Sequence, residues 1–224
     1  MEHWKSRYNV RRFYEDRVPP QQDISAIADI VKYVPSQESK IDHFWFLLTP
    51  EHAVLKQWLL DNVFYYTIND ADDAFSDEDM IQIVTAPYIF LCMNTMLNEK
   101  QQLFARRNSG IVFGALMAEA LRKGYDTSAV GCTRGMNASG NRIQVCEELT
   151  NKLYQTFGAD KCSVMDPYRD SDRLSPYMGL CIGYGMPLEE TIPGVLDNYN
   201  LSTYKDKKYA PFQKLKKPVN NIII

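Results

Sequence analysis

The sequence predicts one domain of the α+β class, with helices wrapped around a mixed central β-sheet. Three observations support this. Short apolar runs typical of buried strands alternate with amphipathic segments long enough to be helices. The connections between these runs are long, so we expect strands of both directions and helices over both faces of the sheet. The 224 residues, 45% of them hydrophobic and 24% charged, suit a single domain with a sizeable core spanning residues 1–224.

The expected helices begin and end at recognisable signals. Asp23 is a typical N-cap residue ahead of a periodic apolar segment. Pro50 suits the first turn of the next helix. The longest helix is expected from Glu99 to Lys123, closed by Gly124 in the conformation that ends many helices. Its second half is apolar on most faces, so it belongs in the core or at a subunit interface. A last amphipathic helix is expected from Ile143 to Phe157.

The expected strands are short apolar runs, some of them rich in aromatic residues or glycine. They are His43–Leu48, Tyr88–Met93, Thr127–Cys132 and Tyr177–Gly185. The stretch from Asn69 to Asp79 holds six acidic residues and predicts a solvated loop with a short helix from Ser76.

Charge and cysteine usage exclude several classes of protein. The net charge of −3 argues against a general nucleic-acid binder. The five cysteines show no CxxC spacing, and the three histidines lie outside any metal-ligand spacing, so we expect neither a disulfide framework nor a bound metal. No apolar run approaches the roughly 20 residues of a membrane span, and the first residues lack the apolar core of a signal peptide. A cytoplasmic protein without membrane contact is therefore expected.

The chain starts with a basic segment that could hold a phosphate. Arg7, Asn9 and Arg11 alternate, so in an extended segment they project to one side. Two guanidinium groups beside an amide donor are a suitable set for an anionic oxygen cluster. A solvated basic terminus is the alternative interpretation, and Arg12 fits it better than it fits a ligand contact.

Four segments together resemble the nitroreductase family of flavin-dependent oxidoreductases. The N-terminal Arg7–Phe13 segment, followed by Val18-Pro19, resembles the family's phosphate-binding motif. The other three are Thr85-Ala86-Pro87, Gly124-Tyr125-Asp126-Thr127 after the central helix, and the glycine-rich strand Gly179–Pro187. Their order and spacing match over nearly the whole chain.

The resemblance implies a nitroreductase-like fold, an intertwined homodimer and FMN bound at the dimer interface. The long central helix would be the dimer seam, and a C-terminal arm from about residue 205 to 224 would extend over the partner subunit. Such an enzyme would transfer hydride from NADH or NADPH through FMN to a small organic acceptor, such as a nitroaromatic compound or a quinone.

The resemblance also implies site residues. Arg7, Tyr8, Asn9 and Arg11 would contact the phosphate and ribityl chain. Asp79 and Gly135 would lie near the flavin ring, with Arg134 just before that glycine. A late basic residue would close on the phosphate, and the candidates for it are Lys205, Lys207 and Lys208.

The chemistry expected of such a protein resides mostly in the flavin, so no catalytic side chain is assigned. Arg134 or Arg107 could stabilise the negative charge of reduced flavin. Two other interpretations stay open. The chain could be a redox-inactive relative that serves as a flavin- or nucleotide-binding module or as a dimeric scaffold, because Asn9 and Arg134 depart from the usual motif residues. It could also be another kind of α+β enzyme with an arginine-held phosphate ligand.

Overall fold

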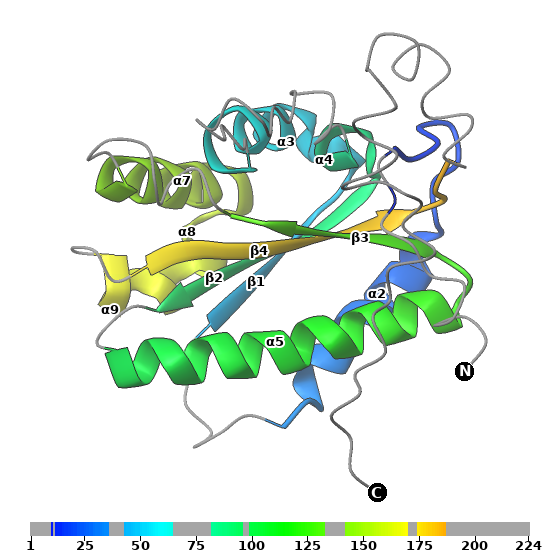
Figure 1. Cartoon of the computed structure of the whole chain (residues 1–224). Coiled ribbons are helices and arrows are strands. Elements are labelled where there is room, and N and C mark those ends of the chain that lie inside the picture. Colours follow the sequence, from blue (N-terminus) through cyan, green and yellow to red (C-terminus); the bar gives the residue numbers. More distant parts are fainter. Residues whose placement is uncertain are drawn as a thin grey trace, which may run out of the picture.

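The structure is a computed structural model, and it describes residues 10, 12–35, 43–64, 82–95, 99–132, 142–169 and 174–186. These residues form a four-stranded sheet with helices on both faces (Figure 1). The strands are β1 (His43–Leu48), β2 (Tyr88–Thr95), β3 (Asp126–Gly131) and β4 (Leu174–Gly183). The main helices are α2 (Gln21–Asp29), α3 (Ala53–Leu59), α4 (Gln82–Thr85), α5 (Glu99–Arg122) and α7 (Arg142–Phe157).

Shorter helical segments complete the described chain. They are η1 (Ile30–Lys32), η3 (Pro50–His52), the π-helical η4 (Leu60–Phe64), α8 (Ala159–Cys162), η6 (Ser163–Met165) and α9 (Asp166–Arg169). None of the helices among the described residues combines the length and apolar composition that crossing a bilayer requires.

The sheet has the strand order β1-β2-β4-β3. Every pairing between described strands is antiparallel, so the parallel pairing of a mixed sheet does not occur among them. Strands β2 and β3 nevertheless run in the same direction, because both pair antiparallel with β4, which lies between them. Helix α5 lies in the crossover that connects them, because two strands that run in the same direction cannot be joined by a tight turn.

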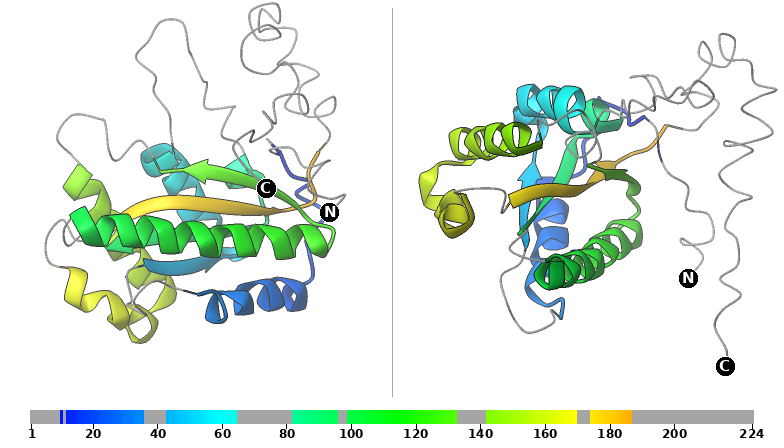
Figure 2. Two further views of the ribbon diagram at one scale, coloured as in Figure 1. Left: turned by 60° about the horizontal axis from the view of Figure 1, so that its bottom comes forward. Right: turned by 60° about the vertical axis from the view of Figure 1, so that its left-hand side comes forward.

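Two layers of helix cover the sheet, and each encloses its own core cluster. Helices α2 and α5 lie on one face, while α3, α4 and α7 lie on the other (Figures 1 and 2). All eight residues of β2 are buried, as expected of a strand covered on both faces. Its side chains alternate between clusters: Ile89, Leu91 and Met93 pack with the α3 and α7 layer, and Tyr88 and Phe90 with the α2 and α5 layer.

Of two helix boundaries predicted from local sequence, one is confirmed and one is wrong. Gly124 follows α5 with φ +86°, as predicted for a helix C-terminus. The prediction that Asp23 is the N-cap of α2 is wrong, because that helix begins at Gln21 after Pro20. Asp23 lies in the first turn and accepts hydrogen bonds from Lys123 Nζ and Tyr125 Oη instead.

Candidate functional site

Four segments that are far apart in the sequence meet beside the end of β4. Residues 12–14 run alongside residues 184–186: Tyr14 N donates to Tyr184 O at 2.9 Å, and Met186 N donates to Arg12 O at 2.9 Å. Phe13 forms an antiparallel bridge with Gly185. We call this region the convergence and define it by the described residues 10, 12–14, 85–87, 126–127 and 183–186.

The segments 85–87 and 126–127 are hydrogen-bonded to residues of the same region. Phe13 N donates to Thr85 Oγ1 at 3.2 Å, which fixes the turn before β2. Gly185 N donates to Asp126 Oδ2 at 2.9 Å, and Val10 N donates to Thr127 O at 3.5 Å. Each of the four segments therefore contacts at least one other through a hydrogen bond.

Gly183 and Gly185 lie so close to neighbouring side chains that the structure requires glycine at both positions. A Cβ on Gly183 would lie 2.7 Å from Pro87 Cδ and 2.8 Å from Phe13 Cδ1. A Cβ on Gly185 would lie 2.6 Å from Val10 Cγ2. A Cβ essentially never comes this close to a non-bonded carbon, so both positions accept a side chain only if their neighbours move. Val10 and Phe13 are fully buried, which leaves them little room to do so.

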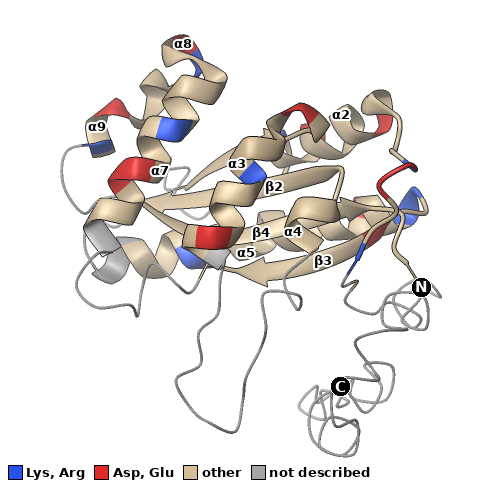
Figure 3. Cartoon of the chain, turned by 90° about the horizontal axis from the view of Figure 1, so that it is seen from above, with Lys and Arg blue, Asp and Glu red and all other residues tan. Residues whose placement is uncertain are grey.

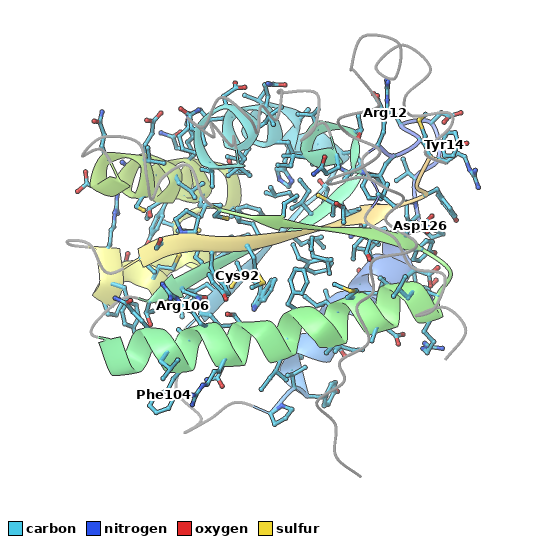
Figure 4. The ribbon with its side chains drawn as sticks, in the orientation of Figure 1. Arg12, Tyr14, Cys92, Phe104, Arg106 and Asp126 are labelled. Carbon is cyan, nitrogen blue, oxygen red and sulfur yellow. The ribbon has the colours of Figure 1, made fainter. Side chains whose placement is uncertain are left out.

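Among the described residues, the charged groups at or beside the convergence include Arg12, Arg17 and Asp126. Asp126 is the only charged residue in the four strands (Figure 3). Burial raises the pKa of its carboxyl, while the bond from Gly185 N and the charge of Arg17 act in the opposite direction. Arg12 Nε is buried and has no hydrogen-bond partner among the described atoms, although the side chain as a whole is 41% exposed. Figure 4 shows Arg12, Tyr14 and Asp126 at the same end of the sheet.

A buried lysine lies behind the convergence. Lys56 on α3 is 3% exposed, and its Nζ donates to Ala86 O and Pro87 O, each at 2.8 Å. Burial lowers the pKa of Lys56 from 10.5 to about 8. Nothing in the sequence marks Lys56 as buried, because a lysine on an amphipathic helix normally faces solvent.

The opposite end of β4 is built differently. A shallow, solvent-open depression lies there, and Asn94, Thr95, Arg106 and Ser175 are among its lining residues. Figure 4 shows Arg106 at the far end of the sheet from Arg12 and Asp126.

Comparison with known proteins gives the fold its name. No protein-family model matches the sequence, and no curated protein matches it. Solved structures do match. An FMN-dependent nitroreductase from Clostridium difficile R20291 aligns with a TM-score of 0.56 at 13% identity, covering 83% of this chain and 90% of that one. The chain has the nitroreductase fold.

Two further structures agree with this result. A nitroreductase family protein from Clostridium novyi NT gives a TM-score of 0.55 at 11% identity, covering 83% of this chain and 84% of that one. A nitroreductase with bound FMN from Bacteroides fragilis NCTC 9343 gives 0.51 at 11% identity, covering 83% and 87%. The predicted fold class is thereby confirmed.

The site residues predicted from the sequence lie outside the described residues. They are Arg7, Tyr8, Asn9, Arg11, Asp79, Arg134 and Gly135, and the same holds for Lys205, Lys207 and Lys208. Their described neighbours give their anchor points. Val10 and Arg12 belong to the convergence, whereas Cys132, two residues before Arg134, follows the other end of β3.

These two anchor points are separated by the length of β3. Val10 N contacts Thr127 O at the start of the strand, and Cys132 N donates to Tyr177 O just past its end. Five steps along a strand span roughly 17 Å.

The cysteines and the remaining charged residues offer little reactive chemistry. All five cysteines are free and buried, and burial raises the pKa of the Cys132 thiol well above its usual range. Cys132 is thus not a reactive thiolate. Arg107 is exposed on α5. The part of the chain that the structure describes contains no group of three or more metal-binding side chains placed around one point.

Proposed function

We propose that this protein is an FMN-dependent oxidoreductase that passes hydride from NADH or NADPH through FMN to a small organic acceptor. The observation that carries the proposal is the convergence. The four segments whose sequences resemble nitroreductase motifs are separated by up to 172 positions in the chain, from Phe13 to Gly185, yet they meet at one point of the structure. The fold supports the same proposal.

The described residues of the convergence fit an anionic ligand. The fixed strand pairing of residues 12–14 holds the end of the basic segment in place, so Arg7 and Arg11 would extend from a rigid anchor toward a phosphate. The orphaned Arg12 Nε is a donor that an anionic oxygen would satisfy. Tyr8 and Asn9 would add hydrogen-bond donors to the same group.

The other proposed contacts lie around the flavin ring. FMN, when bound, supplies the hydride-transfer chemistry itself. The chain would orient it through Gly135 and Asp79, and Arg134 or Arg107 would stabilise negative charge on the ring. Replacing each arginine in turn with alanine tests this point. A reduction potential of the bound flavin that neither change alters would remove the electrostatic role.

The decisive experiment is a visible absorbance spectrum of the purified protein before and after anaerobic NADH or NADPH. The proposal predicts flavin bands that bleach on reduction and return with a nitroaromatic compound or quinone. Bands that neither nucleotide bleaches would favour the redox-inactive binding module. A protein that shows no bands even after FMN is added would contradict the proposal.

We further propose a homodimer with α5 at its seam. The outward face of this helix carries two half-exposed apolar side chains, Leu103 and Ile111. Gly110 and Gly114 lie on the helix with open space beside them, which permits close approach of a second helix. Since all five cysteines are free, a reducing compartment such as the cytoplasm suits such a dimer.

The dimer is tested by an Ile111→Glu variant, with Val54→Glu as a matched control. Both residues are exposed apolar side chains on helices, but Val54 lies on α3 and is 87% exposed. Light scattering should give the dimer mass for the wild type and the control, and a reduced mass for Ile111→Glu. A monomeric wild type would contradict the dimer.

A further inference from the structure

Lys56 is the most unusual titratable group among the described residues. Its amine is buried on α3, and it makes no ion pair with a described residue. Both of its hydrogen bonds go to main-chain oxygens, Ala86 O and Pro87 O, at 2.8 Å each. Burying a lysine without a carboxylate is costly, so the position has a structural or functional purpose.

The two carbonyls belong to the turn that leads from α4 into β2. The chain bends at Pro87, so one amine can reach two successive carbonyl groups. Thr85, one residue earlier, accepts the hydrogen bond from Phe13 N. The ring of Pro87 packs against Gly183. The turn therefore contacts both the N-terminal segment and the end of β4.

We propose that Lys56 is a positioning residue for the ligand site at the convergence. The amine holds the 85–87 turn through its bonds to Ala86 O and Pro87 O. Thr85 of that turn accepts a hydrogen bond from Phe13 N, so the amine also positions Phe13 and its bridge to Gly185. The basic N-terminal segment precedes this bridge in the chain. The proposal that this site takes the phosphate of FMN rests on the function proposed above. The positioning of the N-terminal segment does not.

The Lys56 amine can hold the 85–87 turn in either protonation state, because both forms carry enough N–H donors. A neutral amine has two N–H groups and an ammonium has three, so both forms can satisfy the two carbonyls. The titratable groups near Lys56 are Cys181 on β4, which interacts with it electrostatically, and His52 of η3, whose pKa is lowered mainly by burial and also by the charge of Lys56. Positioning should therefore persist across the pH range in which Lys56 loses its proton.

The first test uses amide hydrogen exchange of the flavin-free protein. A Lys56→Met variant keeps the length of the side chain but removes both donors. We expect the amides of Phe13 and Met186 to exchange about tenfold faster than in the wild type, because local opening of the convergence becomes easier. Lys56→Arg retains donors and should stay near the wild-type rate.

The control is Leu153→Ala, on α7 in the same core cluster but away from the turn. This variant should lower the free energy of unfolding of the whole protein, without a specific increase in the exchange rates of the Phe13 and Met186 amides. If Lys56→Met and Leu153→Ala change these two amides equally relative to the rest of the core, Lys56 is only a stability residue and the inference is wrong. Should Lys56→Met not fold, Lys56→Gln, which keeps a smaller donor, carries the same comparison.

The second test compares FMN with riboflavin, which lacks the phosphate. In the wild type FMN should bind more tightly than riboflavin, and Lys56→Met should reduce that ratio about tenfold while Leu153→Ala leaves it unchanged. An unchanged ratio in Lys56→Met would overturn the link from Lys56 to the phosphate site. If the wild type binds neither flavin, the proposed function fails, and the exchange experiment still decides the positioning role.

Discussion

The two ends of β4 are packed in opposite ways. At its end the strand meets Pro87 and Phe13 so closely that Gly183 has no space for a methyl group. At its start Ser175 lines an open depression, together with Asn94 and Thr95. The first end joins four segments of the chain, whereas the second borders a solvent-open depression, although Asn94, Thr95 and Ser175 themselves are buried.

This difference indicates where the chain is most constrained. The tight end combines glycine, a proline ring and an aromatic ring, so small changes there have nowhere to relax. It is also the end at which the nitroreductase-like segments meet. The open end has space for adjustment, so substitutions there should be tolerated. The following predictions test this contrast, from the largest expected effect to the smallest.

Gly183→Ala should have the largest effect. Its methyl group would overlap Pro87 Cδ and Phe13 Cδ1, both of which belong to rings that cannot bend away. We expect a loss of about 3 kcal/mol in the free energy of unfolding, which corresponds to a melting temperature roughly 6–12 °C lower. Thermal unfolding followed by circular dichroism measures this. A loss below about 1 kcal/mol would show that the convergence is looser than described.

The charge of Lys56 should make stability depend on alkaline pH. Its pKa falls from 10.5 to about 8 on folding, so below pH 8 the folded protein bears the cost of a buried charge. That cost disappears as pH rises from the folded toward the unfolded pKa, and stability should increase. Between about pH 7.5 and about pH 10, the wild type should gain about 2 kcal/mol relative to Lys56→Met.

Urea unfolding of both proteins at the two pH values gives this difference. Subtracting the variant removes the contributions of other groups that titrate in this range, such as Cys181, whose pKa burial raises to about 12. If the wild type instead lost stability relative to Lys56→Met, the amine would be charged and compensated in the folded state.

Asp126→Ala should cost about 1–2 kcal/mol, because Gly185 N would lose its acceptor in a partly buried position. Asp126→Asn is the matched control, since its amide oxygen still accepts that bond. Urea unfolding near neutral pH compares the two variants. Equal losses would mean that the negative charge matters, rather than the hydrogen bond.

Ser175→Ala should have the smallest effect. Its hydroxyl donates to the carbonyl of the next residue, Pro176 O, at 3.3 Å, and the side chain borders the open depression. We expect a change within about 0.5 kcal/mol, measured by the same urea titration. A loss as large as that of Gly183→Ala would remove the contrast between the two ends.

Much of the fold follows from local patterns in the sequence. The four strands and the long helices were predicted because their apolar runs and periodicities are strong, and Gly124 ends α5 as expected. The predicted strand begins at Tyr177, three residues later than β4, which includes Pro176, a residue that sequence patterns disfavour inside a strand. Asp23 failed as an N-cap because Lys123 and Tyr125, about 100 positions away, engage its carboxylate.

The candidate site was less accessible to sequence reasoning. The resemblance identified the four segments, but nothing local shows that they touch, since Phe13 and Thr85 are separated by 72 positions. Lys56 was missed for the same reason. Its burial depends on two carbonyls of a distant turn, and a helical periodicity does not reveal them.

The most direct test of the central claim is amide hydrogen exchange of the wild type with and without FMN. If the convergence is the ligand site, FMN should slow exchange most strongly in residues 10–14, 126–127 and 183–186, with little change around Asn94 and Ser175. Protection confined to the open end of β4, or no protection anywhere at saturating FMN, would contradict it.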